Sequence, residues 1–461
     1  MGKNAANLGA SLDALRGLLG DRLATARAVR DHHAHDIAYH PPMAPDAVAF
    51  PQSTEEVAEI LKICSAHATP VVPFGTGTGV EGGINAVQGG VCVDLGRMDA
   101  ILSVNPADMD ATVQAGVTRN ALNRHLRDTG LFFPVDPGAD ASLGGMASTR
   151  ASGTTAVRYG TMRENVLALT VVLADGRVIK TANRARKSSA GYDLTRLFVG
   201  SEGTLGIVTE VTLRLHGIPE ASLAAVCPFP SFAQAVESVI VTIQSGIPVA
   251  RIEFVDEVVM RAMNLYSGTA YPEEPHLFLE FQGGEAEVRA QAEKVQAIAA
   301  EHGGKGFEWA TREEDRNRLW KARHDVAHAV KVLRPGAGLY SGDVCVPIAR
   351  LAECVARTRA DLDGSFLISG ITGHVGDGNF HAIFLVDPDD PKDMAEVNRL
   401  NDAMVRRALA MGGTCTGEHG VGQGKMKFMR AEHGEAVAVM RQIKQALDPQ
   451  GILNPGKVLP A

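Results

Sequence analysis

The sequence lacks the marks of several protein classes. Its six cysteines are widely separated and none forms a Cys-x-x-Cys pair, so no disulfide framework is indicated and a reducing compartment fits. No window approaches about 18 uninterrupted apolar residues, and the first 40 residues show no secretory signal pattern. We therefore expect a soluble, cytoplasmic protein. A peripheral membrane contact stays open, because such contacts need no long apolar segment.

Positive charge is also sparse. The 45 Lys and Arg residues are outnumbered by 53 Asp and Glu residues, and no basic stripe is visible, which argues against a nucleic-acid partner. Apolar residues at 45% and charged residues at 21% match an ordinary globular protein. A chain of 461 residues is long enough for two or three domains, and it contains no visible internal repeat.

Hydrophobic periodicity organises the first half of the chain. Leucines at helical spacing predict an amphipathic leader helix over residues 11–31. A hydroxyl cap and an acidic first turn predict a helix over 53–67, followed by a strand at 70–74. Short β-like runs separated by glycine turns then predict an α+β domain; these runs lie at 91–95, 112–115, 167–173, 178–181 and 207–215.

The sequence pattern changes near residues 228–230, where alternating helices and strands replace the series of short strands. Helices are predicted at 232–245, 285–302 and 311–332, a strand at 277–282, a strand-turn-strand at 366–386, and two last helices at 394–411 and up to 447. This succession is consistent with a second α+β domain whose sheet caps the first. We predict a helical leader at 1–40, a first domain at 41–219 and a second at 220–461.

A glycine-rich loop follows the strand predicted at 70–74. Gly77, Gly79 and Gly82 have the spacing of the dinucleotide fingerprint, which works only when a helix leaves the loop and faces the pyrophosphate. Residues 83–90 are poor helix formers. Consecutive backbone N–H groups can still bind an anion without a helix. The alternative is a plain glycine turn.

Two more loops of small and hydroxyl-bearing residues lie in the same predicted domain. They cover residues 137–149, followed by Gly153 and Gly160, and residues 200–208, which read Gly-Ser-Glu-Gly-Thr-Leu-Gly-Ile-Val. Three such loops suit a large, flat, polar-edged ligand that the backbone approaches closely.

The three loops resemble the FAD-binding domain of the vanillyl-alcohol oxidase superfamily. The resemblance implies that the first loop holds the pyrophosphate, the second lines the isoalloxazine and phosphates, and the Gly-Ile-Val strand contacts the adenine side. Some relatives attach FAD through a histidine in the first loop; this chain has none between His67 and His125, which implies non-covalent FAD. The implied cofactor-binding residues are Pro73, Gly75, Thr76, Gly77, Thr78, Gly79, Pro137, Gly138, Ser142, Gly144, Ser148, Gly153, Glu202, Gly206, Ile207 and Asn454.

Two histidines flank a Gly-Asp-Gly turn further along. His374 and His381 are seven residues apart, a spacing that would place them on opposite faces of one strand, but the turn removes this constraint. Glu418 and His419 follow on a glycine-flanked loop. Two imidazoles and a carboxylate form a common ligand set for a divalent ion, zinc or manganese. We predict His374, His381 and Glu418 as metal ligands; the alternative is that the histidines are packing residues.

These stretches also resemble a family. The sequences at 374–381, 415–420 and 454–457 are similar to the C-terminal half of FAD-linked D-lactate and D-2-hydroxyglutarate dehydrogenases, and the resemblance runs from about Asp36 to Leu459. It implies an α+β fold: a PCMH-type FAD-binding domain and an α+β substrate (cap) domain, with a C-terminal helical segment that returns to the flavin. It implies that Arg323, on a predicted helix, binds the substrate carboxylate. Without it a solvated arginine would be favoured, and we place Lys321 at the surface.

The chemistry follows from these parts. A 2-hydroxy acid can chelate a metal through its carboxylate and hydroxyl, and coordination lowers the hydroxyl pKa. His419 is the predicted base that takes the proton while the C2 hydride passes to flavin N5. We expect oxidation of D-lactate to pyruvate, with glycolate or a larger 2-hydroxy acid as alternatives. Cytochrome c, a quinone and an electron-transfer flavoprotein are the candidate acceptors, and a homodimer stays open.

The substrate's tail is expected to be small or apolar. Relatives that act on a second carboxylate place polar partners near its far end, where this chain has Ser341 and Ile383, with Ala382 and Phe384 beside Ile383. An unpaired carboxylate against such a wall would be costly. Two other classes stay open: a flavin-bearing subunit that serves mainly in assembly, and a metal-dependent hydrolase.

Overall fold

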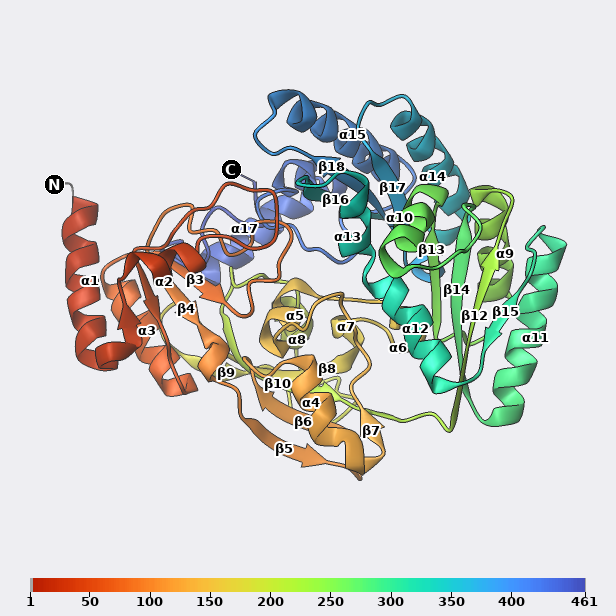
Figure 1. The fold of residues 1–461 in the computed structure, drawn as a ribbon. Coiled ribbons are helices and arrows are strands. Elements are labelled where there is room, and N and C mark those ends of the chain that lie inside the picture. The colour runs from red at the N-terminus through yellow and green to blue at the C-terminus, as the bar shows by residue number, and fades with distance from the viewer. Residues whose placement is uncertain (1–2, 461) are drawn as a thin grey trace. The chain divides into compact units, whose positions relative to one another are not determined.

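The computed structural model describes residues 3–460, which divide into two compact units (Figure 1). The first comprises the chain up to Ser152, Gly160–Ile218 and the segment from Glu418 onward. The second comprises Gly153–Tyr159 and Pro219–Gly417. The main difference from the domains predicted at 41–219 and 220–461 is that the last segment clusters with the first unit. No helix within residues 3–460 is long and apolar enough to cross a membrane.

A small sheet begins the first unit. Its strands lie in the order β1 (Leu23–Ala24), β2 (Ala47–Ala49), β4 (Val91–Asp94) and β3 (Val71–Phe74), parallel except between β1 and β2. Leucines of α1 (Lys3–Leu19) and α3 (Thr54–Ala66) share one buried cluster with this sheet. The helix predicted over 11–31 is wrong in its extent: α1 stops before Gly20, whose φ of +57° leaves the helical region, and α2 (Arg27–His32) follows separately.

The first unit's second sheet is antiparallel. Its order is β5 (Ile101–Asn105), β6 (Asp110–Gln114), β10 (Ile207–Arg214), β8 (Val166–Val172) and β9 (Val178–Lys180). Alternate residues of these strands form a core with α4 (Arg119–Leu126) and α5 (Leu143–Thr149). The glycine-rich loops follow β3, precede α5 and precede β10, and residues 75–90 contain no helix.

One seven-stranded antiparallel sheet forms the centre of the second unit. Its order is β15 (Glu308–Ala310), β12 (Ala221–Pro228), β14 (His276–Gly283), β13 (Arg251–Val255), β17 (Ser369–Gly373), β18 (Asn379–Val386) and β16 (Gly338–Cys345). Strand β18 is buried along its whole length, as expected for an inner strand covered on both faces.

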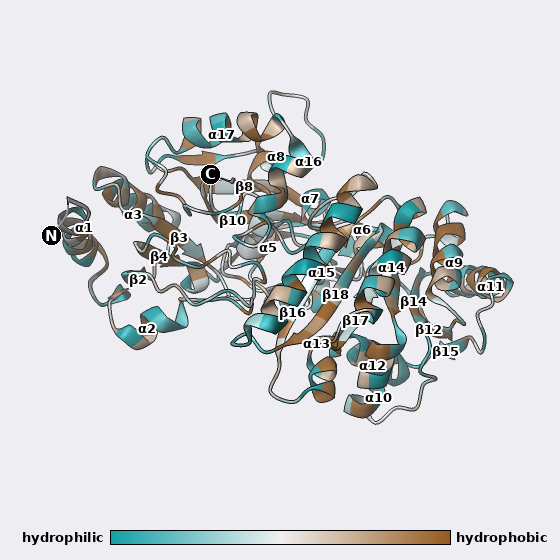
Figure 2. Cartoon of the chain, turned by 90° about the horizontal axis from the view of Figure 1, so that it is seen from above, coloured by the Kyte–Doolittle hydropathy of each residue, from teal (hydrophilic) through white to brown (hydrophobic). Residues whose placement is uncertain are grey.

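Helices cover both faces of this sheet. On one face, α10 (Glu257–Ser267), α12 (Glu313–His324) and α13 (Val326–Ala329) share a buried cluster with Val255. On the other, α9 (Phe232–Gln244) brings Phe232 against Phe254, with ring centroids 4.6 Å apart. The helices α6 (Ala156–Tyr159), α11 (Glu285–Glu301), α14 (Ile348–Asp363) and α15 (Pro391–Ala410) also belong to the unit. In Figure 2, α15 carries teal and brown residues together, the amphipathic pattern of a helix packed on a core.

Candidate functional site

The three glycine-rich loops lie side by side in the first unit. A Cβ at Gly75, in the first loop, would stand 2.3 Å from the Oγ of Ser142 in the second loop. The backbone N–H of Glu202, in the third loop, donates to the carbonyl of Ser148 at 2.9 Å. The loops therefore approach one another as closely as backbone allows, the arrangement expected of a cradle for a large ligand.

Asn454 joins the first and third loops. Its Nδ2 donates to the carbonyls of Gly83 and Glu202 at 3.0 and 2.8 Å, and the residue is 2% exposed. The chain before it is fixed as well, because Leu453 forms a bridge with Val71 of β3. The C-terminal segment thus places the predicted Asn454 among the loops predicted to bind FAD.

The other predicted cofactor residues differ in what they offer. The side chain of Ile207 is buried in the core, so only its backbone is available to a ligand. A Cβ at Gly206 would stand 2.5 Å from Val171, so this glycine is required by packing within the protein. Gly153 belongs to the second unit, unlike the rest of the set. Pro73, Thr76, Gly77, Thr78, Gly79, Pro137, Gly138 and Gly144 lie on the first two loops or at their edges.

An unpredicted carboxylate faces His419 in the first unit. Glu81, inside the first loop, has its Oε1 3.9 Å from His419 Nδ1 and 3.1 Å from Lys425 Nζ. The Glu81 side chain is 7% exposed. The sequence feature that could have identified Glu81 is a single acidic residue within a run of glycines. This contact gives the predicted base a buried charged neighbour.

In the second unit, a tight turn brings the two predicted histidines together. His374 directly follows β17, His381 lies within β18, and Gly378 closes the turn between them with a φ of +79°. The ring centroids are 5.4 Å apart.

Each of these rings presents Nδ1 to a buried carboxylate. His374 Nδ1 lies 2.7 Å from Glu253 Oε1, and His381 Nδ1 lies 3.6 Å from Asp343 Oδ1. Both carboxylates belong to residues with no exposed surface. A histidine whose Nδ1 faces a carboxylate can offer Nε2 to a metal, the common arrangement of histidine ligands. Neither acid was predicted from the sequence.

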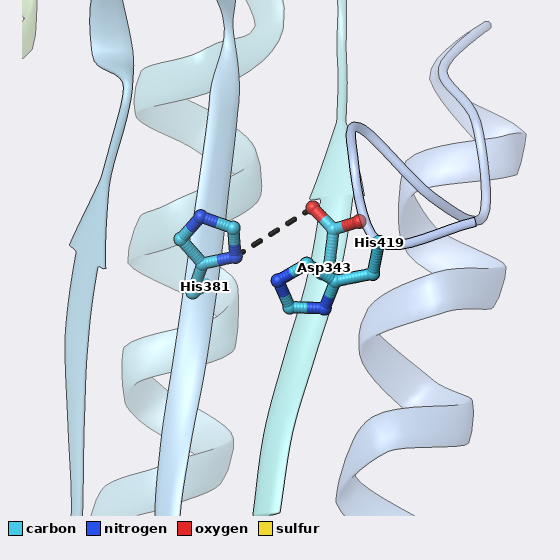
Figure 3. A group of neighbouring side chains, drawn as sticks. All are labelled: Asp343, His381 and His419. Atoms are coloured by element: carbon cyan, nitrogen blue, oxygen red, sulfur yellow. Dashed lines mark ion pairs between the residues drawn. The ribbon is translucent and has the colours of Figure 1, made fainter. Parts of the chain in front are cut away.

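Asp343 also holds the chain that leads to the Glu-His pair. Its carboxylate accepts from Asn379 Nδ2 at 2.7 Å, and from Thr416 Oγ1 and the Gly417 N–H at 2.8 Å each. Figure 3 shows Asp343 and His381 on neighbouring strands, with the ion pair between them dashed. The peptide bond to Gly417 therefore keeps Glu418 beside this sheet.

Two of the three predicted metal ligands, His374 and His381, lie together in the second unit. The third, Glu418, begins the last segment of the first unit, directly after Gly417. Both oxygens of Asp343 accept protein hydrogen bonds, and the ligand role of Glu418 stays a prediction. A histidine pair with a carboxylate fits zinc or manganese.

Arg323 on α12 is buried at 7% exposure, and its NH2 lies 2.5 Å from Glu253 Oε2. Its Nε–H is also buried and has no hydrogen-bond acceptor among residues 3–460. An unsatisfied buried donor on a guanidinium fits a site for a ligand carboxylate. Lys321, on the same helix, is exposed and pairs with Asp325.

The predicted far wall of the substrate pocket lies on two neighbouring strands. Ser341 of β16 is directly opposite Ile383 of β18, and the next aligned pair on that face is Asp343 with His381. Ala382 and Phe384 point to the other face of the sheet, so they do not line this wall. The two residues predicted for the wall that share this face are therefore one hydroxyl and one aliphatic side chain.

Comparisons with known proteins agree with this organisation. A family model described as the FAD linked oxidases, C-terminal domain, matches residues 218–458, and an FAD binding domain model matches 45–182. The solved structure of p-cresol methylhydroxylase with substrate bound has a TM-score of 0.83 at 18% identity, covering 98% of this chain and 96% of that one. This likeness concerns the fold, and it confirms the predicted α+β class with a PCMH-type FAD-binding domain.

Two relatives are similar over almost the whole chain. "Probable D-lactate dehydrogenase, mitochondrial" of Danio rerio is 52% identical over 453 residues, 97% of this chain and 91% of that protein. "D-lactate dehydrogenase [cytochrome], mitochondrial" of Arabidopsis thaliana is 48% identical over 449 residues, 97% of this chain and 79% of that protein. The expected cytoplasmic location is wrong by this comparison, because both relatives are named as mitochondrial proteins. The expectation relied on cysteine spacing, which reports on redox conditions and does not identify the compartment. The chain belongs to the FAD-linked oxidases, with an FAD-binding domain followed by the C-terminal domain of that family.

Proposed function

We propose that this chain is an FAD-dependent dehydrogenase of D-2-hydroxy acids, with D-lactate as its main substrate and pyruvate as the product. The names of the two relatives at 52% and 48% identity support this activity. The observation that carries the proposal is the pairing of His374 with His381 in the second unit, with Arg323 joined to His374 through Glu253. That set offers two contacts to a 2-hydroxy acid, one for its carboxylate and one for its hydroxyl.

Each residue has a role that its geometry favours. The buried Arg323 offers its unsatisfied Nε–H to the substrate carboxylate. A divalent ion at His374, His381 and Glu418 would lower the hydroxyl pKa, and bound FAD would accept the hydride at N5. His419, with Nδ1 toward Glu81, takes the hydroxyl proton at Nε2.

The FAD in this proposal is bound without a covalent link. Acid or heat should therefore release all of the flavin from purified protein. His40 is the histidine to examine if flavin stays on the denatured chain, because a Cβ at Gly82 would stand 2.8 Å from its ring. Retained flavin in wild type that disappears in His40→Ala would contradict non-covalent binding.

A substrate panel tests the activity itself. D- and L-lactate, glycolate and D-2-hydroxyglutarate would be mixed anaerobically with the flavin-loaded protein and followed at the flavin absorbance band. The proposal predicts the fastest bleaching with D-lactate. Faster reduction by glycolate would favour that alternative, and no bleaching with any acid would favour an assembly subunit. Electron transfer from reduced protein to cytochrome c, compared with a quinone, tests the acceptor, for which the name of the Arabidopsis thaliana relative supports a cytochrome.

A further inference from the structure

Glu253 occupies a central position in the second unit that no predicted role accounts for. It lies on β13, between the strands β14 and β17, and its side chain is 1% exposed. One carboxylate oxygen lies 2.7 Å from Nδ1 of His374, and the other lies 2.5 Å from NH2 of Arg323. A single carboxylate therefore contacts a candidate metal ligand and the candidate carboxylate-binding residue.

The contact with His374 sets the chemistry of the ring. A carboxylate cannot donate a hydrogen bond, so Nδ1 of His374 must carry the proton in this pair. The lone pair is then at Nε2, the atom that a metal requires. A carboxylate partner also increases the basicity of the ligating nitrogen and fixes the plane of the ring.

The contact with Arg323 sets the direction of the guanidinium. A buried charge is costly unless it is paired, and here one arginine and one carboxylate balance each other. Because NH2 of Arg323 donates to Glu253, one side of the guanidinium group is held in a fixed orientation. The buried Nε–H remains without an acceptor within residues 3–460, in position to meet an anionic group.

We propose that Glu253 is a positioning residue that couples the metal site to substrate binding, by orienting His374 and Arg323 at once. This inference rests on the proposed function, because it assigns a purpose to the site formed by those two residues. Glu253 itself touches neither metal nor substrate. Its removal should therefore weaken metal affinity and substrate affinity together.

The same sheet contains a matched control. Glu280 of β14 is also a buried carboxylate, at 5% exposure, and its ion pair with Arg251 measures 2.9 Å. Arg251 lies on β13 two residues before Glu253, directly opposite Glu280. The change Glu280→Gln therefore breaks a buried carboxylate–arginine pair in the same sheet without touching a histidine.

The test compares Glu253→Gln with Glu280→Gln in the FAD-loaded protein. Zinc and manganese affinities would be measured by competition with a chelator, and KM and kcat with D-lactate. We expect Glu253→Gln to weaken metal binding about 10- to 100-fold and to raise KM by a similar factor. Glu280→Gln should leave both near wild type. Wild-type metal affinity and KM in Glu253→Gln would overturn the inference.

Three further variants distinguish a failure of this inference from a failure to fold and from a failure of the proposed metal site. If Glu253→Gln does not fold because Arg323 is left buried and unpaired, Arg323→Gln and the double variant Glu253→Gln/Arg323→Gln remove that charge. The double variant should bind metal about tenfold more weakly than Arg323→Gln alone. Equal affinities would contradict the inference. A His374→Ala protein that keeps its metal would instead contradict the proposed metal site, whatever Glu253 does.

Discussion

The backbone N–H of Val421 donates a hydrogen bond to Oε1 of Glu202 at 2.7 Å, although the two residues are 219 positions apart in the chain. The other oxygen of the same carboxylate accepts from the Gly422 N–H at 2.8 Å. Val421 follows the Glu418-His419 pair by two residues. Glu202 was predicted to contact FAD, but its carboxylate instead binds the loop that contains the predicted base. Burial raises the pKa of Glu202, and the two N–H donors oppose that shift.

Glu202→Ala should destabilise the protein because it leaves two N–H donors without an acceptor. Each costs about 1–3 kcal/mol when buried, so we expect the free energy of unfolding to fall by about 2–6 kcal/mol. Urea unfolding of the flavin-loaded protein measures this. Glu59→Ala, in the same unit but with a side chain 51% exposed, serves as the control and should change little. Equal stability of the two variants would contradict the assigned role.

His419→Gln should slow flavin reduction while leaving the metal bound. The loss of a general base costs about 10²- to 10⁴-fold, and the metal ligands are unchanged. Stopped-flow reduction and metal analysis would be run on the same sample. His433→Gln, at a half-exposed histidine paired with Glu432, is the control. Loss of metal from His419→Gln would show that this histidine is a ligand.

The pocket wall predicts a preference for small substrates. If Ser341 and Ile383, which are paired across β16 and β18, face the far end of the substrate as predicted, a second carboxylate would be buried there without a partner. We expect kcat/KM for D-2-hydroxyglutarate to be roughly 100-fold or more below that for D-lactate. Ser341→Lys should narrow the gap by supplying a cation. A wild-type preference for D-2-hydroxyglutarate would show that this wall does not face the substrate.

Acid should destabilise the first unit through His216. Burial lowers the pKa of this histidine to about 4, and Arg214 and Arg186 add to the shift. The unfolded ring has a pKa of about 6.5, so between these values the unfolded chain binds a proton that the folded chain does not. The stability contribution of His216 therefore falls as the pH drops from about 6.5 to 4. His216→Gln should remove this part of the pH dependence, and identical slopes of stability against pH in both proteins would contradict the assignment.

Local sequence patterns predicted many of the helices and strands. Alternation and capping residues predicted α3, β8, β10 and α9 close to their observed bounds. The turn between His374 and His381 was predictable because Gly378 lies between them and adopts the left-handed conformation that the turn needs. These features depend on neighbouring residues, which is why the sequence shows them.

Other features depend on contacts between distant residues. The last segment clusters with the first unit through contacts such as Asn454 with Glu202, 252 positions apart. Glu253 meets His374 only because β13 lies beside β17 in the sheet. Asp343 faces His381 through the pairing of β16 with β18. No local pattern encodes these strand orders, so the carboxylates behind the histidines could not be identified from sequence.

Single-turnover reduction of the flavin by D-lactate, with and without metal, tests the central claim most directly. Wild type, wild type stripped by a chelator, and His374→Ala would be mixed anaerobically with D-lactate and followed at the flavin band, with FAD content measured in each. The account predicts rapid bleaching in wild type, slow bleaching in the other two at unchanged FAD content, and recovery of the stripped protein on adding zinc or manganese. Bleaching at the wild-type rate in metal-free protein would contradict it.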